Sequence, residues 1–542
     1  MSVTPIQLQG APHRQHAMEA GTINPGVLAA QYAVRGELPT RAAALQRVLD
    51  AGGAAAAALP FREIIYCNVG NPLAVGNRPY TYHRQVLALC DCPDLLQGLD
   101  AATAEKLFPA DVQAAARRLL QATGIGGTGA YSESAGVTLI RQDVAEYMNA
   151  RDGLAGEHPL AATAADVFLS NGSSGAILML LSLLADTGSR EASAAAAASR
   201  TVMPSSPPAG VLIPVPQYPI YSALLTVLGT HQLQYHLQEH RQWALDVTEL
   251  ERLVQDARQR GIDPRALVVI SPGNPTGQLL EAANVQEILA FAHRERLLLL
   301  ADEVYADNVY VDDRRFESFR RVLHRDMPSE VQRELELVSL YSASKGLVSE
   351  CGRRGGYMLL SPGVTSAARE QLTKIASIML CPNLGGQVMV DCVVRPPQPG
   401  QPSYPLYARE RAERFASLQR RAHLVVQAFC SMTAVECNPS QGAMYAFPRV
   451  RVSARAAQAA RDAGMPLDTF YCVRLLERTG ICVVPGAGFG MRSAGEENGD
   501  GSVSFYLRTT ILPPEDKMHD VMDAIKKHHE EFLHKYGSVS KM

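Results

Sequence analysis

Side chains able to do chemistry follow directly on four apolar, strand-like segments in the middle of the chain. They stand in Asn171-Gly172-Ser173-Ser174-Gly175, Ser271-Pro272-Gly273-Asn274-Pro275-Thr276-Gly277, Asp302-Glu303-Val304-Tyr305 and Ser342-Ala343-Ser344-Lys345, and a fifth motif, Cys351-Gly352-Arg353-Arg354-Gly355-Gly356-Tyr357, comes shortly after. In α/β sheets, ligands gather beyond the carboxyl ends of the strands. The spacing therefore predicts that these motifs meet at one site.

The first and last of these motifs suit an anion such as a phosphate. Ser173 and Ser174 open an apolar helix, where small residues expose backbone N–H groups and the helix dipole favours negative charge. One of Arg353 and Arg354 can hold a phosphate through two hydrogen bonds, while the other can simply be exposed. Taken alone, the serine motif also fits an ordinary helix N-cap with a tight turn.

Two further motifs suit a nitrogen-containing ring. Asp302 ends a buried strand, where a carboxylate needs a partner such as a protonated ring nitrogen or an arginine. Tyr305 stands three residues on, and Pro275 holds Asn274 out of the helical region so that its amide is presented at a fixed angle. Taken singly, Asp302 and Tyr305 also fit a salt bridge beside a core tyrosine, and Asn274-Pro275 also fits an ordinary surface turn.

Lys345 completes the set, because desolvation at the end of a buried strand would make its amine a usable nucleophile and base. A lone lysine is far more often a solvated charge. It is improbable that all of these features occur together by chance, in order and at strand ends: an anion cup, an Asn, a buried Asp with a Tyr, a Lys and an Arg. Together they describe a phosphorylated, electron-poor pyridine ring held covalently by a lysine, which is pyridoxal 5′-phosphate.

The elements that must position these residues alternate between strands and helical patterns such as Ser173–Ala185 and Ala282–Arg294. Strands are predicted at Ala165–Ser170, Val211–Pro216, Gln232–Leu237, Ala266–Ser271, Leu297–Asp302, Leu337–Ser342 and Gly356–Leu360. This alternation favours βαβ units, and the continuous apolar runs favour helices on both faces. The predicted fold class is α/β, with a mostly parallel seven-stranded sheet between helices and a second, smaller α+β domain.

The pattern changes after about residue 385. A helix at Arg409–Cys430 precedes short strands near Ala443–Phe447, Ile481–Val484 and Ser504–Thr509. We expect an N-terminal arm over residues 1–60, a small domain from 61–105 and 385–542, and a large cofactor-binding domain over 106–384. An Ala/Ser/Pro-rich stretch at 190–210 is expected to be a surface insertion in the large domain.

The composition is that of a globular protein. Of 542 residues, 47% are hydrophobic and 19% charged, which excludes wholesale disorder, collagen and coiled coil. With 51 Lys and Arg against 54 Asp and Glu, the net charge of -3 gives no reason to expect a nucleic-acid or membrane-surface partner. The 10 cysteines show no framework spacing, so we expect free thiols in a reducing compartment and no metal, with structural zinc the poorer alternative.

The expected location is the cytoplasm. The best apolar run, Gly175 to Ala185, is shorter than the roughly 18 residues that a membrane-spanning helix needs. The final Ser540-Lys541-Met542 resembles a peroxisomal or glycosomal address. An N-terminus that is poor in acids before Glu19 and contains Arg14 gives weak support to a mitochondrial transit peptide.

Over almost its whole length the sequence resembles the fold-type I pyridoxal-phosphate-dependent aminotransferases of class I and II, and among them the alanine aminotransferases. Matching stretches include NVGNPLAVGNRPYTYHRQVLALC from Asn68, GAYSESAGVTLIRQDVAEYMNARDG from Gly129, VLIPVPQYPIYSA from Val211, CNPSQGAMYAFP from Cys437 and FYCVRLLERTGICVVPGAGFG from Phe470. Departures are modest. The insertion is extra, Arg353 stands where the family usually has an aromatic residue, and Ser173 stands where many members have Ala.

The resemblance implies roles at the ring of the cofactor. Lys345 matches the lysine that holds the cofactor as a Schiff base and then acts as base and acid, and Asp302 matches the partner of the pyridine nitrogen. Asn274 and Tyr305 match the residues that hydrogen-bond the ring hydroxyl, with Asn274 also near the substrate. Tyr218 matches the aromatic residue that stacks on the ring.

The resemblance also implies a phosphate cup, a substrate clamp and a partner subunit. The cup residues are Ser173, Ser174, Ser342 and Arg354. Arg508 matches the arginine that binds the substrate α-carboxylate, and Gly70 matches a backbone contact to the same group. Tyr131 resembles the tyrosine that reaches the phosphate of the neighbouring subunit, so a homodimer is expected.

The expected reaction is ping-pong transamination between L-alanine and 2-oxoglutarate, giving pyruvate and L-glutamate. Arg508 suits a carboxylate, and no second arginine matches a clamp for a distal carboxylate, which fits alanine as one donor. One alternative is an aminotransferase of the same subgroup with larger donors, such as aromatic amino acids or aminoadipate. Others are a lyase related to aminocyclopropane-carboxylate synthase, and a regulator without turnover, whose DNA-binding pattern is missing from the first 60 residues.

Overall fold

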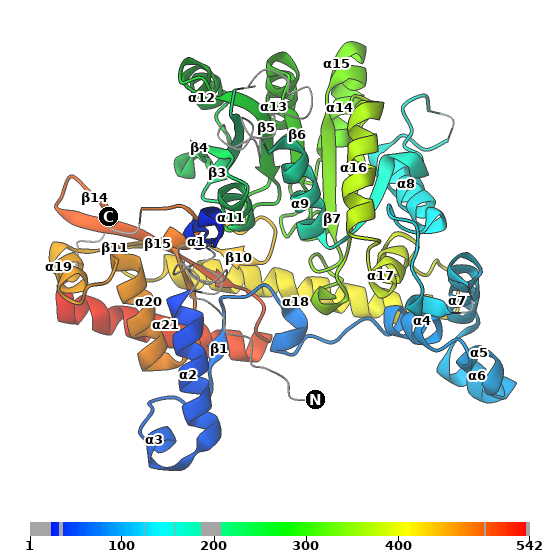
Figure 1. Cartoon of the computed structure of the whole chain (residues 1–542). Helices are drawn as coiled ribbons and strands as arrows, with labels where there is room; N and C mark the ends of the chain where they lie inside the picture. Colours follow the sequence, from blue (N-terminus) through cyan, green and yellow to red (C-terminus); the bar gives the residue numbers. More distant parts are fainter. Residues whose placement is uncertain are drawn as a thin grey trace, which may run out of the picture.

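Seven strands form one hydrogen-bonded sheet in the larger part of the molecule (Figure 1). In spatial order they are β2 (Val167–Asn171), β8 (Gly355–Leu360), β7 (Leu337–Ser342), β6 (Leu298–Asp302), β5 (Asp263–Ile270), β3 (Ala209–Val215) and β4 (His231–His236). Neighbouring strands are parallel except where β8 pairs with β2 and β7. The prediction of seven strands in a mostly parallel sheet is confirmed, with ends shifted by three residues or fewer.

The computed structural model describes residues 23–31, 36–124, 126–156, 158–185, 207–492 and 495–537. Most of the predicted insertion at 190–210 lies outside the described residues, as do the first 22 residues and the terminal Ser540-Lys541-Met542. Among the residues that are described, no helix is long and apolar enough to cross a membrane.

Helices cover both faces of the sheet, which is why its strands are continuous apolar runs. The helices of the two layers are α9 (Ser173–Leu184), α11 (Ile220–Val227) and α16 (Ser366–Ile378), and α12 (Val247–Gln259), α13 (Ala282–Glu295) and α14 (Phe319–Asp326). Val268 and Leu300 pack with the first three helices, whereas their neighbours Leu267 and Leu299 pack with the second three. Successive residues of a strand point to opposite faces of the sheet, so both faces of these strands are buried.

A second sheet belongs to the smaller unit and centres on β15 (Ser502–Thr510). The other strands of this unit are β9 (Val435–Glu436), β10 (Tyr445–Ala446), β11 (Arg449–Ser453), β13 (Val484–Pro485) and β14 (Glu496–Glu497), with β1 (Ile65–Tyr66) paired separately to β12 (Ile481–Cys482). Its helices are α18 (Tyr404–Cys430), α19 (Ala454–Asp462), α20 (Leu467–Thr479) and α21 (Glu515–Tyr536). The helix and short strands predicted after residue 385 are therefore present.

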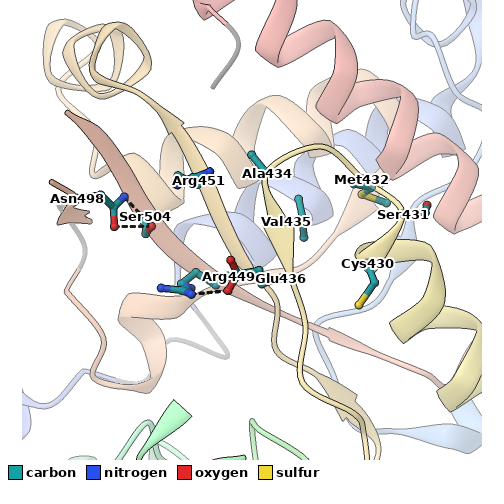
Figure 2. A pocket seen from close by; sticks show the side chains of 10 residues that line it. All are labelled: Cys430, Ser431, Met432, Ala434, Val435, Glu436, Arg449, Arg451, Asn498 and Ser504. Carbon is teal, nitrogen blue, oxygen red and sulfur yellow. Dashed lines mark hydrogen bonds and ion pairs between the residues drawn. The ribbon is translucent and has the colours of Figure 1, made fainter. Parts of the chain in front are cut away.

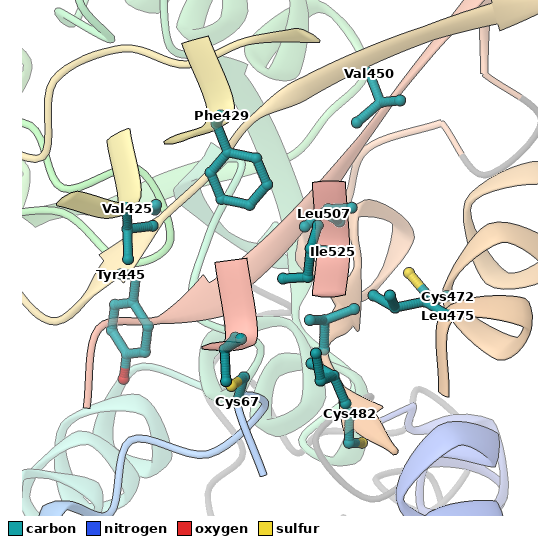
Figure 3. Packing of buried hydrophobic residues seen from close by; sticks show 14 of the residues in the cluster. Cys67, Val425, Phe429, Tyr445, Val450, Cys472, Leu475, Cys482, Leu507 and Ile525 are labelled. Atoms are coloured by element: carbon teal, nitrogen blue, oxygen red, sulfur yellow. The ribbon is translucent and has the colours of Figure 1, made fainter. Parts of the chain in front are cut away.

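The core of the smaller unit is built from both ends of the chain (Figure 3). Phe429 of α18, Leu507 of β15 and Ile525 of α21 lie in one buried cluster with Leu475 of α20. Cys67, which follows β1, joins the same cluster and is fully buried. The N-terminal segment is thus part of this core, although the other elements lie more than 330 residues further along the chain.

The N-terminal segment divides between the two units. Its helix α4 (Thr81–Asp91) packs with α7 (Ala110–Thr123), α8 (Thr138–Asp152) and α17 (Leu384–Val394) in a cluster that also contains residues of β2 and β8. The remaining helices are α1 (Pro25–Ala29), α2 (Glu37–Ala51), α3 (Gly53–Ala57), α5 (Leu95–Gly98), α6 (Ala101–Leu107) and α15 (Ser329–Glu334). The expected domain bounds stay a prediction, and this packing favours counting α4 and α17 with the larger unit.

Candidate active site

The predicted anion site lies where β2 turns into α9. Gly172 adopts a positive φ of 72° immediately before the helix, and no side chain caps the N-terminus of α9. Arg354 Nη2 donates to Ser174 Oγ at 2.9 Å and to the Asn171 carbonyl at 3.0 Å. A Cβ on Gly172 would lie 2.5 Å from Arg354 Nη2, so only glycine leaves room for the guanidinium. The uncapped N–H groups and the guanidinium together favour a phosphate.

Two more of the predicted cup residues lie at this end of the sheet. Ser342 ends β7 and is buried, and its Oγ accepts a hydrogen bond from the Ser344 N–H at 3.2 Å. Ser344 Oγ in turn accepts from Arg354 Nη1 at 3.3 Å. Ser173 is half-buried at the first position of α9. The predicted cup residues therefore come from the ends of two adjoining elements and the loop before β8.

Asp302 ends β6 and is buried, with 3% of its surface exposed. Its Oδ2 accepts a hydrogen bond from the Tyr221 hydroxyl at 2.8 Å, whereas its Oδ1 is buried without a partner. Burial raises the pKa of Asp302 to about 6, although the Tyr221 hydroxyl, the Val304 N–H and Lys345 each lower it. A buried carboxylate oxygen without a donor is costly, so this atom is suited to a donor from a ligand.

Lys345 lies three residues beyond β7, and its Nζ donates to the Gly70 carbonyl at 3.3 Å. Gly70 belongs to the N-terminal segment, 275 residues away. A Cβ on Gly70 would overlap the Tyr445 hydroxyl and would lie 3.2 Å from Lys345 Nζ. The absence of a side chain at Gly70 therefore lets the amine, the phenol and a backbone carbonyl meet.

Arg508 of β15 is buried, with 2% of its surface exposed. Its Nη1 donates to Asn274 Oδ1 at 2.9 Å and its Nη2 to the Asn68 carbonyl at 2.5 Å, while its Nε is buried without a partner. The guanidinium carbon lies 4.2 Å from the ring centroid of Tyr445 and 4.7 Å from that of Phe489. These two hydrogen-bond partners are neutral, so the positive charge of Arg508 remains available to a carboxylate.

Three tyrosines, Tyr218, Tyr305 and Tyr445, interact with these charged residues or with one another. The Tyr305 hydroxyl is 3.0 Å from the Tyr445 hydroxyl, and both rings are buried. Burial raises the pKa of Tyr305 well above its usual value, with Tyr445 and Tyr218 adding to the rise and Arg508 opposing it. Tyr218 stands just before α11. Burial and Asp302 raise the pKa of Tyr221, and Tyr218 adds to the rise. The predicted ring contacts Tyr218 and Tyr305 thus interact, Asp302 is joined to Tyr221 by a hydrogen bond, and Asn274 is joined to Arg508.

Sequence reasoning missed several members of this arrangement. Tyr221 lies three residues after Tyr218, and this helical spacing was a usable signal that both face the same site. Asn68 and Tyr445 stand inside stretches that carry the family resemblance, but nothing in their local sequence shows that they approach Arg508. Tyr131 is not drawn into the site, and 79% of its side chain is exposed.

A separate cavity of about 250 Å³ lies in the smaller unit (Figure 2). It is lined by Cys430, Ser431, Met432, Ala434, Val435, Glu436, Arg449, Arg451, Asn498 and Ser504. Arg449 hydrogen-bonds Glu436, Arg451 pairs with Asp500, and Asn498 hydrogen-bonds Ser504. Its charged side chains thus have partners in the lining or beside it, and none of the predicted catalytic or binding residues lines it.

Comparison with known proteins agrees with this geometry. The family described as aminotransferase class I and II matches residues 100–525. A probable mitochondrial alanine aminotransferase of Dictyostelium discoideum is 43% identical over 96% of this chain and 90% of its own length, and alanine aminotransferase 1 of Bos taurus is 43% identical over 97% of each. Glutamate–glyoxylate aminotransferase 1 of Arabidopsis thaliana is 42% identical over 96% of this chain and 98% of its own.

The fold is also similar to that of solved aminotransferase structures. The structure of an alanine aminotransferase from Pyrococcus furiosus superposes with a TM-score of 0.65, covering 93% of this chain and 99% of its own at 20% identity. An aminotransferase from Escherichia coli superposes with a TM-score of 0.66, covering 98% of this chain and 100% of its own at 18% identity. The fold-type I architecture expected from the sequence is confirmed.

Proposed function

The chain belongs to the class I and II aminotransferase family, and from this premise we propose that it transfers the amino group of L-alanine to 2-oxoglutarate. The products are pyruvate and L-glutamate. The full-length similarity to proteins named alanine aminotransferase supports this choice of substrates. The single structural observation that carries the proposal is Arg508, a buried arginine with an unpartnered Nε. It is hydrogen-bonded to Asn274 and lies against the ring of Tyr445, whose hydroxyl is next to Gly70.

Pyridoxal 5′-phosphate is the cofactor of this family, and the residues present fit it. Asp302 Oδ1 is a buried oxygen that lacks a donor, which suits a protonated ring nitrogen. The uncapped start of α9 and Arg354 suit the phosphate. When bound, the cofactor supplies a carbonyl carbon that takes up the amino group and a ring that accepts the electron pair left at the substrate Cα.

The chain's own residues would hold charges and move protons. Asp302, ionised at neutral pH because its pKa is about 6, would keep a proton on the ring nitrogen. Arg508 would bind the substrate α-carboxylate through its planar guanidinium, with Asn274 fixing the orientation of that plane. Lys345, once free, would take the proton from the substrate Cα and return it to the cofactor side, first as base and then as acid.

A homodimer is part of the proposal. Tyr131, Ile378 and Leu380 are exposed by 79%, 81% and 55%. The loop of Tyr131 is tied to α16 by a hydrogen bond between Ser134 Oγ and Ser377 Oγ at 3.1 Å, so these apolar groups form one surface. Exposed apolar groups that gather in this way indicate an interface. The family resemblance implies that a second copy bound there contributes its Tyr131 to the phosphate end of this site.

A coupled assay with L-alanine and 2-oxoglutarate tests the function. Pyruvate and glutamate should appear in equal amounts, and pyruvate formed without glutamate would show a lyase instead. A donor panel with aromatic amino acids and aminoadipate addresses the alternative donors. Glyoxylate belongs in the acceptor panel, because one relative is named a glutamate–glyoxylate aminotransferase. Alanine turnover far below that of a larger donor would overturn the choice of substrate.

Cytoplasmic location stays a prediction. One of the relatives carries the word mitochondrial in its name, and the terminal Ser540-Lys541-Met542 keeps the peroxisomal expectation open to test. Fluorescent fusions with the reporter at either end would decide, because a reporter after Met542 masks a C-terminal address and one before Met1 masks an N-terminal one.

A further inference from the structure

Tyr445 stands where the two units meet, although no role was expected for it. It belongs to β10, whose partner β15 carries Arg508. Its side chain is buried, with 2% of its surface exposed. Its hydroxyl is 3.0 Å from that of Tyr305, which follows β6 of the larger sheet, and its ring faces Arg508. One side chain therefore contacts a residue expected at the cofactor ring and a residue expected at the substrate carboxylate.

The hydroxyl of Tyr445 lies among positive charges. Lys345 and Arg508 face it, as do the titratable groups of Tyr305 and Cys351. Burial raises the pKa of Tyr445, but Lys345, Arg508 and the hydrogen bond from Tyr305 lower it by more, so it ends below its ordinary value. The two hydroxyls lie 3.0 Å apart and share one hydrogen bond, in which either oxygen can be the donor. Tyr445 therefore takes up one of the hydrogen bonds that the Tyr305 hydroxyl can make.

The ring of Tyr445 makes a second contact of a different kind. The guanidinium carbon of Arg508 lies 4.2 Å from the ring centroid, within the range of a cation–π interaction. Phe489 holds the same guanidinium at 4.7 Å. Because an arginine side chain has many rotamers, a flat aromatic face fixes the plane in which the guanidinium presents its N–H groups.

We propose that Tyr445 is a positioning residue of this site, whose hydroxyl orients Tyr305 and whose ring orients Arg508. The inference rests on the proposed transamination, because only there do both oriented groups serve one reaction. The two contacts are separable by substitution. Tyr445→Phe removes the hydroxyl and keeps the aromatic face, whereas Tyr445→Leu removes both.

A matched control exists in the same buried cluster. Tyr471 is also a fully buried phenol of the smaller unit, and its hydroxyl lies 3.2 Å from His529 Nδ1, away from the site residues. Tyr471→Phe therefore removes a buried hydroxyl of equal size without touching the site. All three variants are loaded with cofactor, and their thermal unfolding is measured beside that of the unmodified protein.

The first readout is the pH midpoint at which the absorbance of the bound cofactor changes. In Tyr445→Phe the Tyr305 hydroxyl loses this partner, which changes the hydrogen bond that it can make to the ring oxygen. The midpoint should shift by about half a pH unit or more, the size of one neutral hydrogen bond. Tyr471→Phe should leave the midpoint unchanged. A midpoint in Tyr445→Phe equal to that in Tyr471→Phe would overturn the role of the hydroxyl.

The second readout is binding of a carboxylate that cannot react. 2-Methylalanine has no hydrogen on Cα, so its effect on the absorbance reports binding without turnover. Its dissociation constant should rise about tenfold in Tyr445→Leu and change less than about twofold in Tyr445→Phe, because only the former loses the cation–π contact. Equal dissociation constants in the two variants would overturn the role of the ring.

These outcomes are distinguishable from failure of the proposed function. If the unmodified protein loaded with cofactor did not convert alanine, the proposed substrate would be wrong, yet the pH midpoint and the binding of 2-methylalanine would still decide the role of Tyr445. If the two Tyr445 variants differed from the unmodified protein only in thermal unfolding, Tyr445 would be a packing residue and the inference would be wrong.

Discussion

Asp302 should make the cofactor-free protein less stable at neutral pH than a protein without this charge. The carboxyl is buried, and its pKa is raised from 3.8 to about 6 by burial. A raised pKa in the folded state means that folding favours the protonated form. The contribution of Asp302 to stability is then fully present below about pH 4 and is lost as the pH rises through about 6. Asp302→Asn keeps an oxygen to accept the Tyr221 hydrogen bond and removes the charge.

The magnitude follows from the shift. A rise from 3.8 to about 6 corresponds to about 3 kcal/mol at pH 7.5, and to about half of that at pH 5. The difference in free energy of unfolding between cofactor-free Asp302→Asn and the unmodified protein should therefore be larger at pH 7.5 than at pH 5, by about 1 to 1.5 kcal/mol in favour of the variant. Urea denaturation at the two pH values, at one protein concentration, measures this difference.

Asp468 provides the matched control. Burial also raises its pKa to about 6, but its carboxylate accepts the backbone N–H groups of Ala487 and Thr469. Asp468→Asn should show the same dependence on pH with unchanged affinity for the cofactor. With cofactor bound, Asp302→Asn should instead lose tenfold to about a hundredfold in affinity, because the ring nitrogen loses a charged partner. A stability difference that stays constant from pH 5 to pH 7.5 would refute the buried charge.

Three other substitutions test the remaining parts of the site. Lys345→Ala should bind the cofactor without the absorbance of the lysine-linked form and lose about a thousandfold or more in turnover, and retained turnover would contradict its role as base. Arg508→Lys keeps the charge but not the planar geometry, so KM for both amino and oxo acids should rise about tenfold or more, and an unchanged KM would exclude it as the carboxylate clamp. Gly172→Ala should displace Arg354 and weaken cofactor binding about tenfold, as measured by equilibrium titration. Its control is Gly124→Ala, which imposes a similar strain at φ 84° with no atom within 4 Å; equal affinities in the two variants would contradict the clash.

The sheet could be predicted from the sequence because each strand is buried on both faces and therefore reads as a continuous apolar run. Its spatial order could not. The antiparallel β8 lies between β2 and β7, and such pairing depends on distant contacts that no local pattern records. Helix α4 was expected in the smaller unit, but its amphipathic pattern does not show which unit its apolar face meets.

The candidate site was predictable where chemistry marks the residue itself. Asp302 and Lys345 stand out as charges at the ends of apolar strands. Tyr445 and Asn68 were missed because a buried phenol and a backbone carbonyl have no local signature. Their contacts with Arg508 join it to another strand and to a residue 440 positions earlier in the chain. Arg508 itself was identified through family resemblance, since a lone arginine in an apolar strand does not reveal its ligand.

The separation of 440 residues between Asn68 and Arg508 has a consequence for synthesis of the protein. During translation, Asn68 and Gly70 are made long before β15. Closing so long a loop costs chain entropy, which burial in the core shared with α18, α20 and α21 helps to offset. A nascent chain that ends before β15 lacks Arg508, the proposed carboxylate clamp, and the strand that pairs with β10, which carries Tyr445. Ribosome-bound fragments that end before β15 should therefore be unable to bind the amino acid at the proposed site.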